Sequence, residues 1–260
     1  NLARPDDHSL LPAWLGEGSW AEPWQTLADR VREQPRDALV SRARLLGLAV
    51  APLKQPAPFA PPWCTIAALG EIRPTPRDRP PRVLDLSALW AGPLCAHLLH
   101  LAGADVIKVE SLQRPDGARF GPPRFFDLMN AGKRSVALDF SDRHDRAVLR
   151  RLIQTADIVV ESARPRALQH FGIHAESLVR ETPGLTWLGI TGYGRQGPAA
   201  QWVAFGDDAA AAAGLATATA PDAPIFCGDA IADPLTGLYA AVACLLAWQQ
   251  GGGVLLDVAL

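Results

Sequence analysis

The chain has 260 residues, of which 48% are hydrophobic and 20% are charged, with 25 basic against 27 acidic side chains. This composition indicates a globular protein with a sizeable core and excludes wholesale disorder. The net charge of −2 lacks the basic excess of a nucleic-acid binder. The longest apolar stretch, residues 238–248, is about half of the ~20 residues that a membrane span needs.

Four cysteines, Cys64, Cys95, Cys227 and Cys244, lie far apart and form no CxxC pair. They are too few for a disulfide scaffold, and their spacing is not that of a zinc site. We therefore expect buried thiols in a cytoplasmic protein. Because the single methionine is Met129 and the chain ends inside a predicted strand, we also expect a fragment of a longer chain.

Helical patterns occupy residues 24–33 and 37–46 of the N-terminal segment. In the second, Leu39, Ala43 and Leu46 recur at spacings that place them on one helix face, and Gly47 ends the pattern.

Proline-rich stretches follow at 52–62 and 74–81, and the second reads "PTPRDRPP". Proline at this density is incompatible with regular structure. We expect an N-terminal helical and linker segment over residues 1–80, followed by one domain over 81–260.

From residue 82 onward, short apolar runs alternate with helical segments. Strands are predicted at 82–87, 105–111, 134–140, 157–162, 185–192 and 253–260. Helices are predicted at 93–101 (ended by Gly103), 142–155 (capped by Asp142) and 233–250, with an Ala-rich helix within 209–220 that ends at Gly214. This alternation favours an α/β fold with a mostly parallel sheet and flanking helices.

Several common catalytic motifs are absent. The turn after the first of these strands, 87–93, lacks GxGxxG, and neither a P-loop nor a GxSxG elbow occurs. The Gly-rich segment 191–198 is equally typical of an ordinary turn. His97 and His100 are three residues apart on a predicted helix but have no third ligand nearby, so no metal site is predicted.

Asp233 precedes Pro234 and a long apolar helix, which predicts Asp233 as the N-cap and Pro234 as the first helical residue. The free N–H groups of a helix N-terminus favour an ionised carboxylate and would stabilise an oxyanion. The pattern alone fits a cap far more often than a nucleophile.

Seven motifs, in uninterrupted order, resemble those of the family III CoA-transferases, the CaiB/BaiF group. They read "VLDLSALWAGP" (83–93), "AGADVIKVES" (102–111), "DGAR" (116–119), "LMNAGKRSVALDF" (128–140), "ADIVVESARPRALQHFGI" (156–173), "ITGYGRQGP" (190–198) and "IADPLTGLYAAVACLLA" (231–247). The resemblance implies a Rossmann-like sheet and an enzyme that moves CoA between an acyl-CoA and a carboxylic acid.

The family's catalytic aspartate falls on Asp233, with the family's glycine four residues later at Gly237. The resemblance implies a covalent aspartyl intermediate, CoA as substrate rather than as a tightly bound cofactor, and no metal. It also implies an interlocked homodimer or, in a tandem chain, an intrachain pseudo-dimer. The net charge and the short apolar stretch predict no nucleic-acid or membrane partner.

The residues implied to bind CoA only partly follow the family's pattern. The family's Asn-aromatic pair, which often grips the adenine, reads Ser162 and Ala163 here, and Ser111 stands where a basic residue often follows the strand. Asp116 and Arg119 keep the DxxR motif. The other candidate CoA-binding residues are Ala91, Gly92, Arg114, Arg134, Leu138 and Asp139.

Two alternatives remain open. The fold also hosts 2-methylacyl-CoA racemases, but their His-Asp pair reads Gly206-Asp207 here, which leaves no imidazole to move the α-proton. The altered adenine positions favour instead a non-catalytic structural half of a tandem CoA-transferase. In support of a tandem arrangement, residues 37–53 resemble a segment found late in the family chain.

Overall fold

The computed structural model describes residues 1–16, 23–53, 62–75, 78–218 and 224–260. The chain forms two compact units, each described by itself below. The helical unit comprises Asn1–Ala60 and Trp202–Ala232, and the sheet unit comprises Pro61–Gln201 and Asp233–Leu260.

The helical unit begins with a small four-helix core. Its helices are α1 (Pro5–Ser9), α2 (Leu11–Leu15), α3 (Pro23–Arg32) and α4 (Arg36–Leu45). Leu39 and Ala43 of α4 are buried against Trp14, whose Nε1 donates to the Leu39 carbonyl oxygen at 2.9 Å. The predicted helical pair 24–33 and 37–46 is thereby confirmed, and Gly47 ends α4 in a left-handed conformation with φ of 77°.

The same unit contains the Ala-rich segment. Helix α10 (Gly206–Ala212) ends before Gly214, as predicted, but begins earlier than residue 209. A two-stranded ribbon follows, formed by β7 (Thr217–Ala218) and β8 (Pro224–Ile225). The remainder of the predicted Ala-rich segment, residues 219 and 220, lies outside the described residues.

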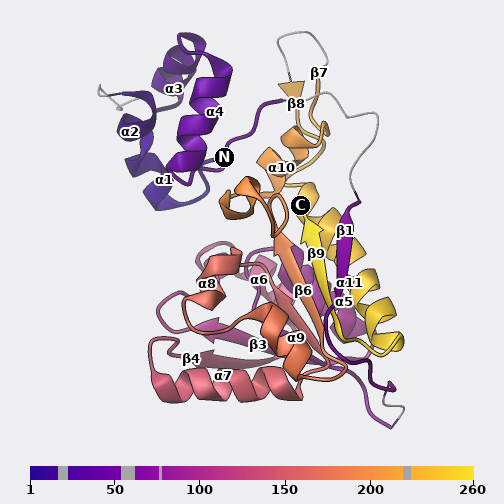
Figure 1. The fold of residues 1–260 in the computed structure, drawn as a ribbon. Helices are drawn as coiled ribbons and strands as arrows, with labels where there is room; N and C mark the ends of the chain where they lie inside the picture. The colour runs from indigo at the N-terminus through magenta and orange to yellow at the C-terminus, as the bar shows by residue number, and fades with distance from the viewer. Residues whose placement is uncertain (17–22, 54–61, 76–77, 219–223) are drawn as a thin grey trace. The chain divides into compact units, whose positions relative to one another are not determined.

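The sheet unit is built on a seven-stranded sheet with the order β1-β9-β6-β5-β2-β3-β4 (Figure 1). The strands are β1 (Cys64–Ala68), β2 (Arg82–Asp85), β3 (Asp105–Ser111), β4 (Arg134–Leu138), β5 (Ile158–Glu161), β6 (Thr186–Thr191) and β9 (Val254–Ala259). All neighbouring pairs are parallel except β1 and β9. The predicted Rossmann-like, mostly parallel α/β fold is confirmed.

Strand β1 corrects the expectation of an irregular linker up to residue 80. Residues 64–68 pair antiparallel with β9, with Cys64 opposite Val258 and Ala68 opposite Val254. The signal was weak because β1 is an edge strand whose side chains are mostly exposed, so it shows no buried apolar alternation.

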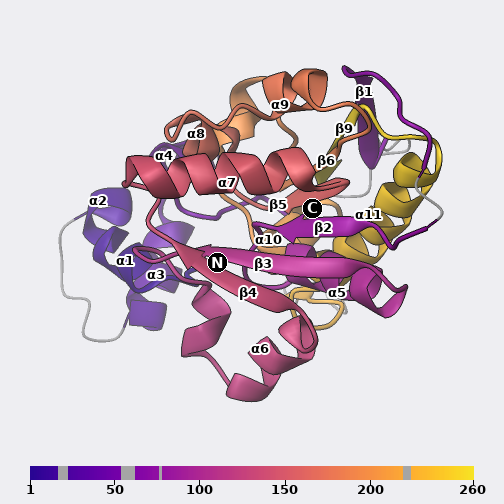
Figure 2. The same ribbon diagram turned by 90° about the horizontal axis from the view of Figure 1, so that it is seen from below.

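Helices cover both faces of the sheet (Figure 2). One face packs against α5 (Ala91–Leu101) and α11 (Ala232–Gln249), and the other against α7 (Arg143–Thr155), α8 (Pro165–Gln169) and α9 (Ala175–Glu181). Consecutive strand residues alternate between these cores: Leu188 faces α5 and α11, whereas Trp187 faces the opposite layer. Asp142 caps α7 as predicted, because its Oδ1 accepts from the Asp145 N–H at 3.0 Å.

The shorter elements of the sheet unit are η1 (Gly117–Phe120), α6 (Pro123–Asn130) and η2 (Pro198–Gln201). Among the described residues, no helix has both the length and the apolarity needed to cross a membrane.

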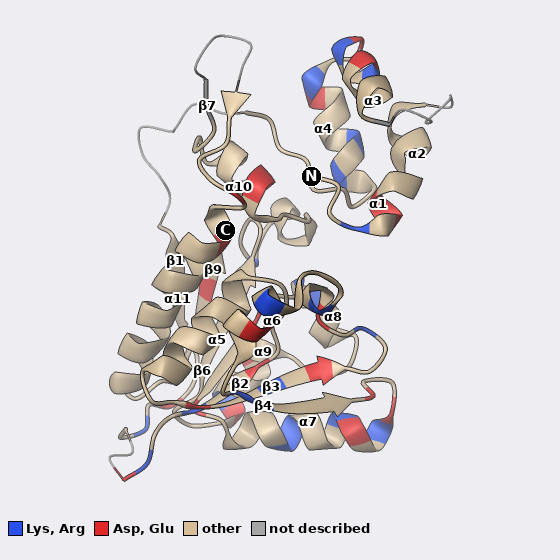
Figure 3. Cartoon of the chain, turned by 180° about the vertical axis from the view of Figure 1, so that it is seen from behind, with Lys and Arg blue, Asp and Glu red and all other residues tan. Residues whose placement is uncertain are grey.

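Helix α11 is buried on one side only. Ala240, Ala241 and Cys244 lie in the core. A stripe on the other side is 40–53% exposed and consists of Leu235, Leu238, Tyr239, Val242 and Leu246. Figure 3 shows this helix as almost free of charged residues. A contiguous exposed apolar stripe marks an interaction surface or an aggregation liability.

We therefore expect the 260-residue chain to self-associate, as light scattering of the purified protein would show. Val242→Lys should shift it towards the monomer, because a charge in the stripe opposes its burial. Leu45→Lys, at a position 88% exposed on α4, is the matched control and should leave association unchanged. A monomeric wild-type chain at high concentration would contradict this expectation.

Candidate active site

The strand order places a switch point between β2 and β5. The chain proceeds from β2 to β3 and β4 on one side, then returns to β5 on the other side of β2. Ligands of open parallel sheets bind outside the carboxyl ends of the strands at such a point. At this place lie the turn of residues 86–92, which follows β2, and Ser162 and Ala163, which follow β5.

The turn 86–92 is held by hydrogen bonds from three neighbouring segments. Ser162 Oγ accepts from the Ala88 N–H at 3.1 Å, and Asp116 Oδ1 accepts from the Leu89 N–H at 2.9 Å. Lys108 Nζ donates to the Ser87 carbonyl oxygen at 3.0 Å. Leu89 lies in the left-handed region with φ of 70°, a conformation that persists only when the surroundings over-determine it.

A buried ion pair lies directly beneath this turn. Lys133 Nζ is 2.8 Å from Asp85 Oδ2, and the side chains are 1% and 0% exposed. Lys133 also donates to the Pro93 carbonyl oxygen at 2.9 Å and to Asn130 Oδ1 at 3.1 Å. Burial lowers the pKa of Lys133, and the facing Asp85 carboxylate opposes that shift. The other Asp85 oxygen accepts from the backbone N–H and the hydroxyl of Ser87.

A second buried pair joins β3 to the loop that follows it. Lys108 Nζ lies 2.9 Å from Asp116 Oδ2, with both side chains at most 2% exposed. Next to it, Arg119 donates to both oxygens of Glu110, at 2.8 and 2.6 Å. The Arg119 hydrogen bonds hold the pKa of Glu110 below its usual value, against the opposing effect of burial. Both charged residues of the DxxR motif therefore hold the loop after β3 against the strand.

Helix α11 approaches this turn through a glycine. A Cβ on Gly237 would lie 2.7 Å from the Ala91 carbonyl oxygen, and one on Gly92 would lie 2.2 Å from Ser87 Cβ. Only glycine permits such approaches. Because Asp233 and Gly237 are four residues apart, they share one face of α11, so Asp233 lies on the side that meets the start of α5.

The structure corrects the predicted cap. Helix α11 begins at Ala232, so Asp233 and Pro234 are its second and third residues rather than its N-cap and first residue. Proline is accommodated there because the first four N–H groups of a helix have no intrahelical acceptor. The Asp233 carboxylate remains in the first turn, where the partial positive charge of the helix favours its ionised form.

All of the predicted CoA-binding residues except Arg134 lie at the carboxyl edge of the sheet. Ala91, Gly92, Ser162 and Ala163 lie at the switch point, and Leu138 and Asp139 at the carboxyl end of β4. Arg119 and the exposed Arg114 lie in the loop region after β3 on the same edge.

Arg134 is not brought together with them. It is the first residue of β4 and pairs with Asp105, the first residue of β3, at 2.6 Å. It therefore stands at the amino end of the sheet, about 13 Å from the other end at 3.3 Å per strand residue.

Sequence reasoning missed the residues that anchor the Gly-rich loop 191–198. Arg195 Nη1 donates to Glu161 Oε1 at 2.5 Å, and the Arg195 N–H donates to Asp257 Oδ2 at 2.9 Å. A Cβ on Gly189 would lie 2.7 Å from the Arg195 guanidinium. A glycine inside a strand was the available signal, since it marks a close approach.

No group of three or more His, Cys, Asp or Glu side chains suited to a metal ion occurs in the described part of the chain. His97 and His100 neighbour each other, with ring centroids 6.3 Å apart. Burial lowers the pKa of His97, with a further contribution from Lys133.

Comparison with known proteins gives a consistent result. The model of CoA-transferase family III matches residues 81–260. The chain is 34% identical over 208 residues to succinate–glutarate CoA-transferase of Agrobacterium fabrum, covering 71% of this chain and 52% of that protein. It is 34% identical over 200 residues to succinyl-CoA–D-citramalate CoA-transferase of Chloroflexus aurantiacus, covering 70% and 50%.

Among solved structures, a CaiB/BaiF family protein from Brucella suis superposes with a TM-score of 0.64 at 32% identity, covering 71% of this chain and 53% of that one. The chain thus spans about half the length of the relatives it matches.

The Asp85–Lys133 pair yields a stability prediction. Lys133→Met should lower the free energy of unfolding by about 3–5 kcal/mol, because it leaves Asp85 buried without its cation. Adding Asp85→Asn should recover much of the loss. The control Arg134→Met breaks an exposed pair and should cost at most about 1 kcal/mol. Denaturant unfolding of the wild-type chain and the three variants measures these changes, and equal losses for Lys133→Met and Arg134→Met would contradict the assignment.

Proposed function

Because the chain belongs to CoA-transferase family III, we propose that the protein transfers CoA between an acyl-CoA and a carboxylic acid through a covalent intermediate on Asp233. The observation that carries this proposal is the placement of the Asp233 carboxylate. It stands in the first turn of α11, on the face that meets the start of α5 at the switch point of the sheet.

The proposed reaction needs only carboxyl chemistry. The Asp233 carboxylate attacks the thioester carbonyl of the donor, which forms a mixed anhydride and releases CoA thiolate. The thiolate attacks the Asp233 carbonyl of this anhydride, which yields an aspartyl-CoA thioester and the free donor acid. The acceptor carboxylate attacks the aspartyl thioester carbonyl to form a second anhydride and expel CoA thiolate. The thiolate then attacks the acceptor's acyl carbonyl, which gives the new acyl-CoA and restores Asp233.

The backbone around Asp233 supplies hydrogen-bond donors in fixed positions. N–H groups in the first turns of α5 and α11 are directed outward, as at any helix N-terminus, and favour the oxyanion of each addition step. The turn 86–92 is held rigidly by the Asp85, Lys108 and Asp116 side chains, so these donors keep their positions during the reaction.

We propose that CoA lies along the carboxyl edge of the sheet. Its candidate contacts there are Ala91, Gly92, Arg114, Arg119, Leu138, Asp139, Ser162 and Ala163. Arg134 is left out because it pairs with Asp105 at the amino end. Since one relative is named for succinate and glutarate and another for succinyl-CoA and D-citramalate, a dicarboxylyl-CoA donor and a dicarboxylate acceptor are the first substrates to test.

The test is chemical trapping. The full chain is incubated with succinyl-CoA and hydroxylamine, and mass spectrometry searches for a hydroxamate at Asp233. Absence of the adduct with a broad panel of acyl-CoA donors would favour the non-catalytic alternative. Ser162 supports this alternative, because its hydroxyl stands at one of the altered adenine positions and already accepts from the Ala88 N–H. Calorimetry with CoA then separates an inactive binder from a purely structural half.

Asp233→Asn should lower kcat by about 10³-fold or more, because an amide is not a nucleophile. The loss of first-turn charge should cost less than about 1 kcal/mol of stability. The control Asp229→Asn removes an exposed carboxylate just before the helix and should be neutral. Near-normal transfer by Asp233→Asn would reject the nucleophile assignment.

Arg119→Ala should raise the KM for acyl-CoA with kcat little changed, because a cation at this edge contributes to binding rather than to bond making. The Glu110 carboxylate also loses its bidentate partner in this variant, so unfolding is measured alongside. Arg151→Ala, an exposed arginine on α7, is the control. An unchanged KM would leave Arg119 only its structural role as the partner of Glu110.

A further inference from the structure

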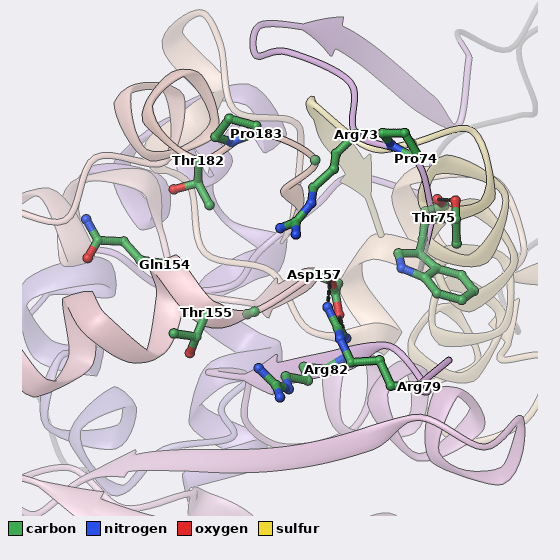
Figure 4. A pocket seen from close by; sticks show the side chains of 14 residues that line it. Arg73, Pro74, Thr75, Arg79, Arg82, Gln154, Thr155, Asp157, Thr182 and Pro183 are labelled. Carbon is green, nitrogen blue, oxygen red and sulfur yellow. Dashed lines mark hydrogen bonds and ion pairs between the residues drawn. The ribbon is translucent and has the colours of Figure 1, made fainter. Parts of the chain in front are cut away.

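A cavity of about 330 Å³ opens at the amino end of the sheet, away from the candidate active site (Figure 4). Loops before β2, β5, β6 and β9 line it, and all of its lining residues belong to the sheet unit. Helix α11 separates the two places: Asp233 is near its start, and Trp248, near its end, lines the cavity. An 18-residue helix is about 27 Å long, so the cavity is distinct from the active site.

Residues 73–75 of the connection between β1 and β2 form the roof of the cavity. Two hydrogen bonds to backbone carbonyl oxygens hold them: the Arg73 N–H donates to Gly251 at 2.8 Å, and Thr75 Oγ1 donates to Trp248 at 2.9 Å. A Cβ on Gly251 would lie 2.7 Å from the Arg73 carbonyl oxygen. Gly251 has φ of 96°, so the glycine permits both the turn and the close approach.

Three arginines line this cavity together with one carboxylate. Arg79 Nη1 and Nη2 donate to Asp157 at 2.6 and 2.9 Å, and the Arg82 N–H donates to the same carboxylate at 2.8 Å. The Asp157 charge is therefore already neutralised by Arg79. No hydrogen bond or ion pair joins the guanidinium of Arg73 or Arg82 to any side chain in the described ranges.

Figure 4 shows the guanidinium of Arg73 directed into the cavity toward Asp157, and Arg82 on the side of Thr155. The hydroxyls of Thr75 and Thr155 donate to backbone carbonyl oxygens, so they have no proton left for a ligand. The indole Nε1 of Trp248 is buried and has no acceptor among the described residues. Two unpaired cations and a buried unpaired N–H call for an acceptor-only ligand.

We propose that this cavity binds the phosphate group of a small anionic ligand. A phosphate dianion matches the two guanidinium charges that no carboxylate in the described ranges compensates. Its tetrahedral oxygens can accept from donors on different walls of the cavity, and Arg73 and Arg82 are such donors. Guanidinium forks bind such oxygens in pairs. A carboxylate offers two oxygens in one plane and fits donors from several directions less well.

The experiment is calorimetric titration of the full chain with inorganic phosphate, and with succinate as the dicarboxylate comparison. We expect saturable phosphate binding that is tighter than succinate binding. Arg73→Ala and Arg82→Ala should each weaken phosphate binding by about tenfold or more. Trp248→Phe should weaken it by a smaller factor, because one neutral donor is lost.

The control Arg143→Ala, at the opposite end of α7 from the cavity, should bind phosphate like the wild-type chain. Asp233→Asn should do the same, which separates this proposal from the proposed transferase reaction. Circular dichroism confirms that each variant is folded. Absence of saturable phosphate binding, succinate binding as tight as phosphate, or equal losses in Arg143→Ala and the Arg73 and Arg82 variants would overturn the proposal.

Discussion

The need to neutralise charges buried beneath the turn after β2 organises the carboxyl edge of the sheet. Asp85 and Lys133, and Lys108 and Asp116, are nearly inaccessible pairs, and either member alone would carry a large desolvation cost. Each pair also reaches backbone groups. Lys108 holds the Ser87 carbonyl oxygen, and Lys133 holds that of Pro93, at the start of α5. The four side chains come from different elements, so these contacts join β2 to β3 and to the α6–β4 region.

This rigidity explains how the turn tolerates Leu89 in a left-handed conformation. Strain of this kind persists only where the surroundings leave no alternative, and here the N–H of Leu89 is held by Asp116. Gly92 lets the start of α5 pack against Ser87 in this turn, and Gly237 lets α11 pack against Ala91 of α5, so the network also supports the N-terminal part of α11. Asp233 lies in the first turn of the helix that this network supports.

The fold was predictable from the sequence because short apolar runs alternate with helical segments along residues 82–260, and strands such as β5 and β6 are buried at every position. Strand β1 was not predicted, because its side chains are mostly exposed and it follows a proline-rich stretch. Asp233 could be singled out by its place before an apolar helix, but its position within the first turn depends on where α11 begins. The buried lysines were missed because Lys108 and Lys133 look like ordinary surface charges, and their partners are distant in sequence. Arg134 was misplaced for the related reason that a strand's first and last residues belong to opposite ends of the sheet.

The charged side chains beneath the candidate active site and those around the cavity differ in whether they are paired within the protein. At the carboxyl end, Asp85, Lys108, Asp116 and Lys133 are paired within the protein, so this end is organised before any ligand arrives. Catalysis benefits from such preorganisation, because groups that are already fixed cost no reorganisation during the reaction. At the amino end, Arg79 satisfies Asp157, and Arg73 and Arg82 have no such partner in the described part of the chain. The guanidinium groups of Arg73 and Arg82 are exposed at this cavity and have no carboxylate partner among the described residues there, so they are available to an anion that enters it.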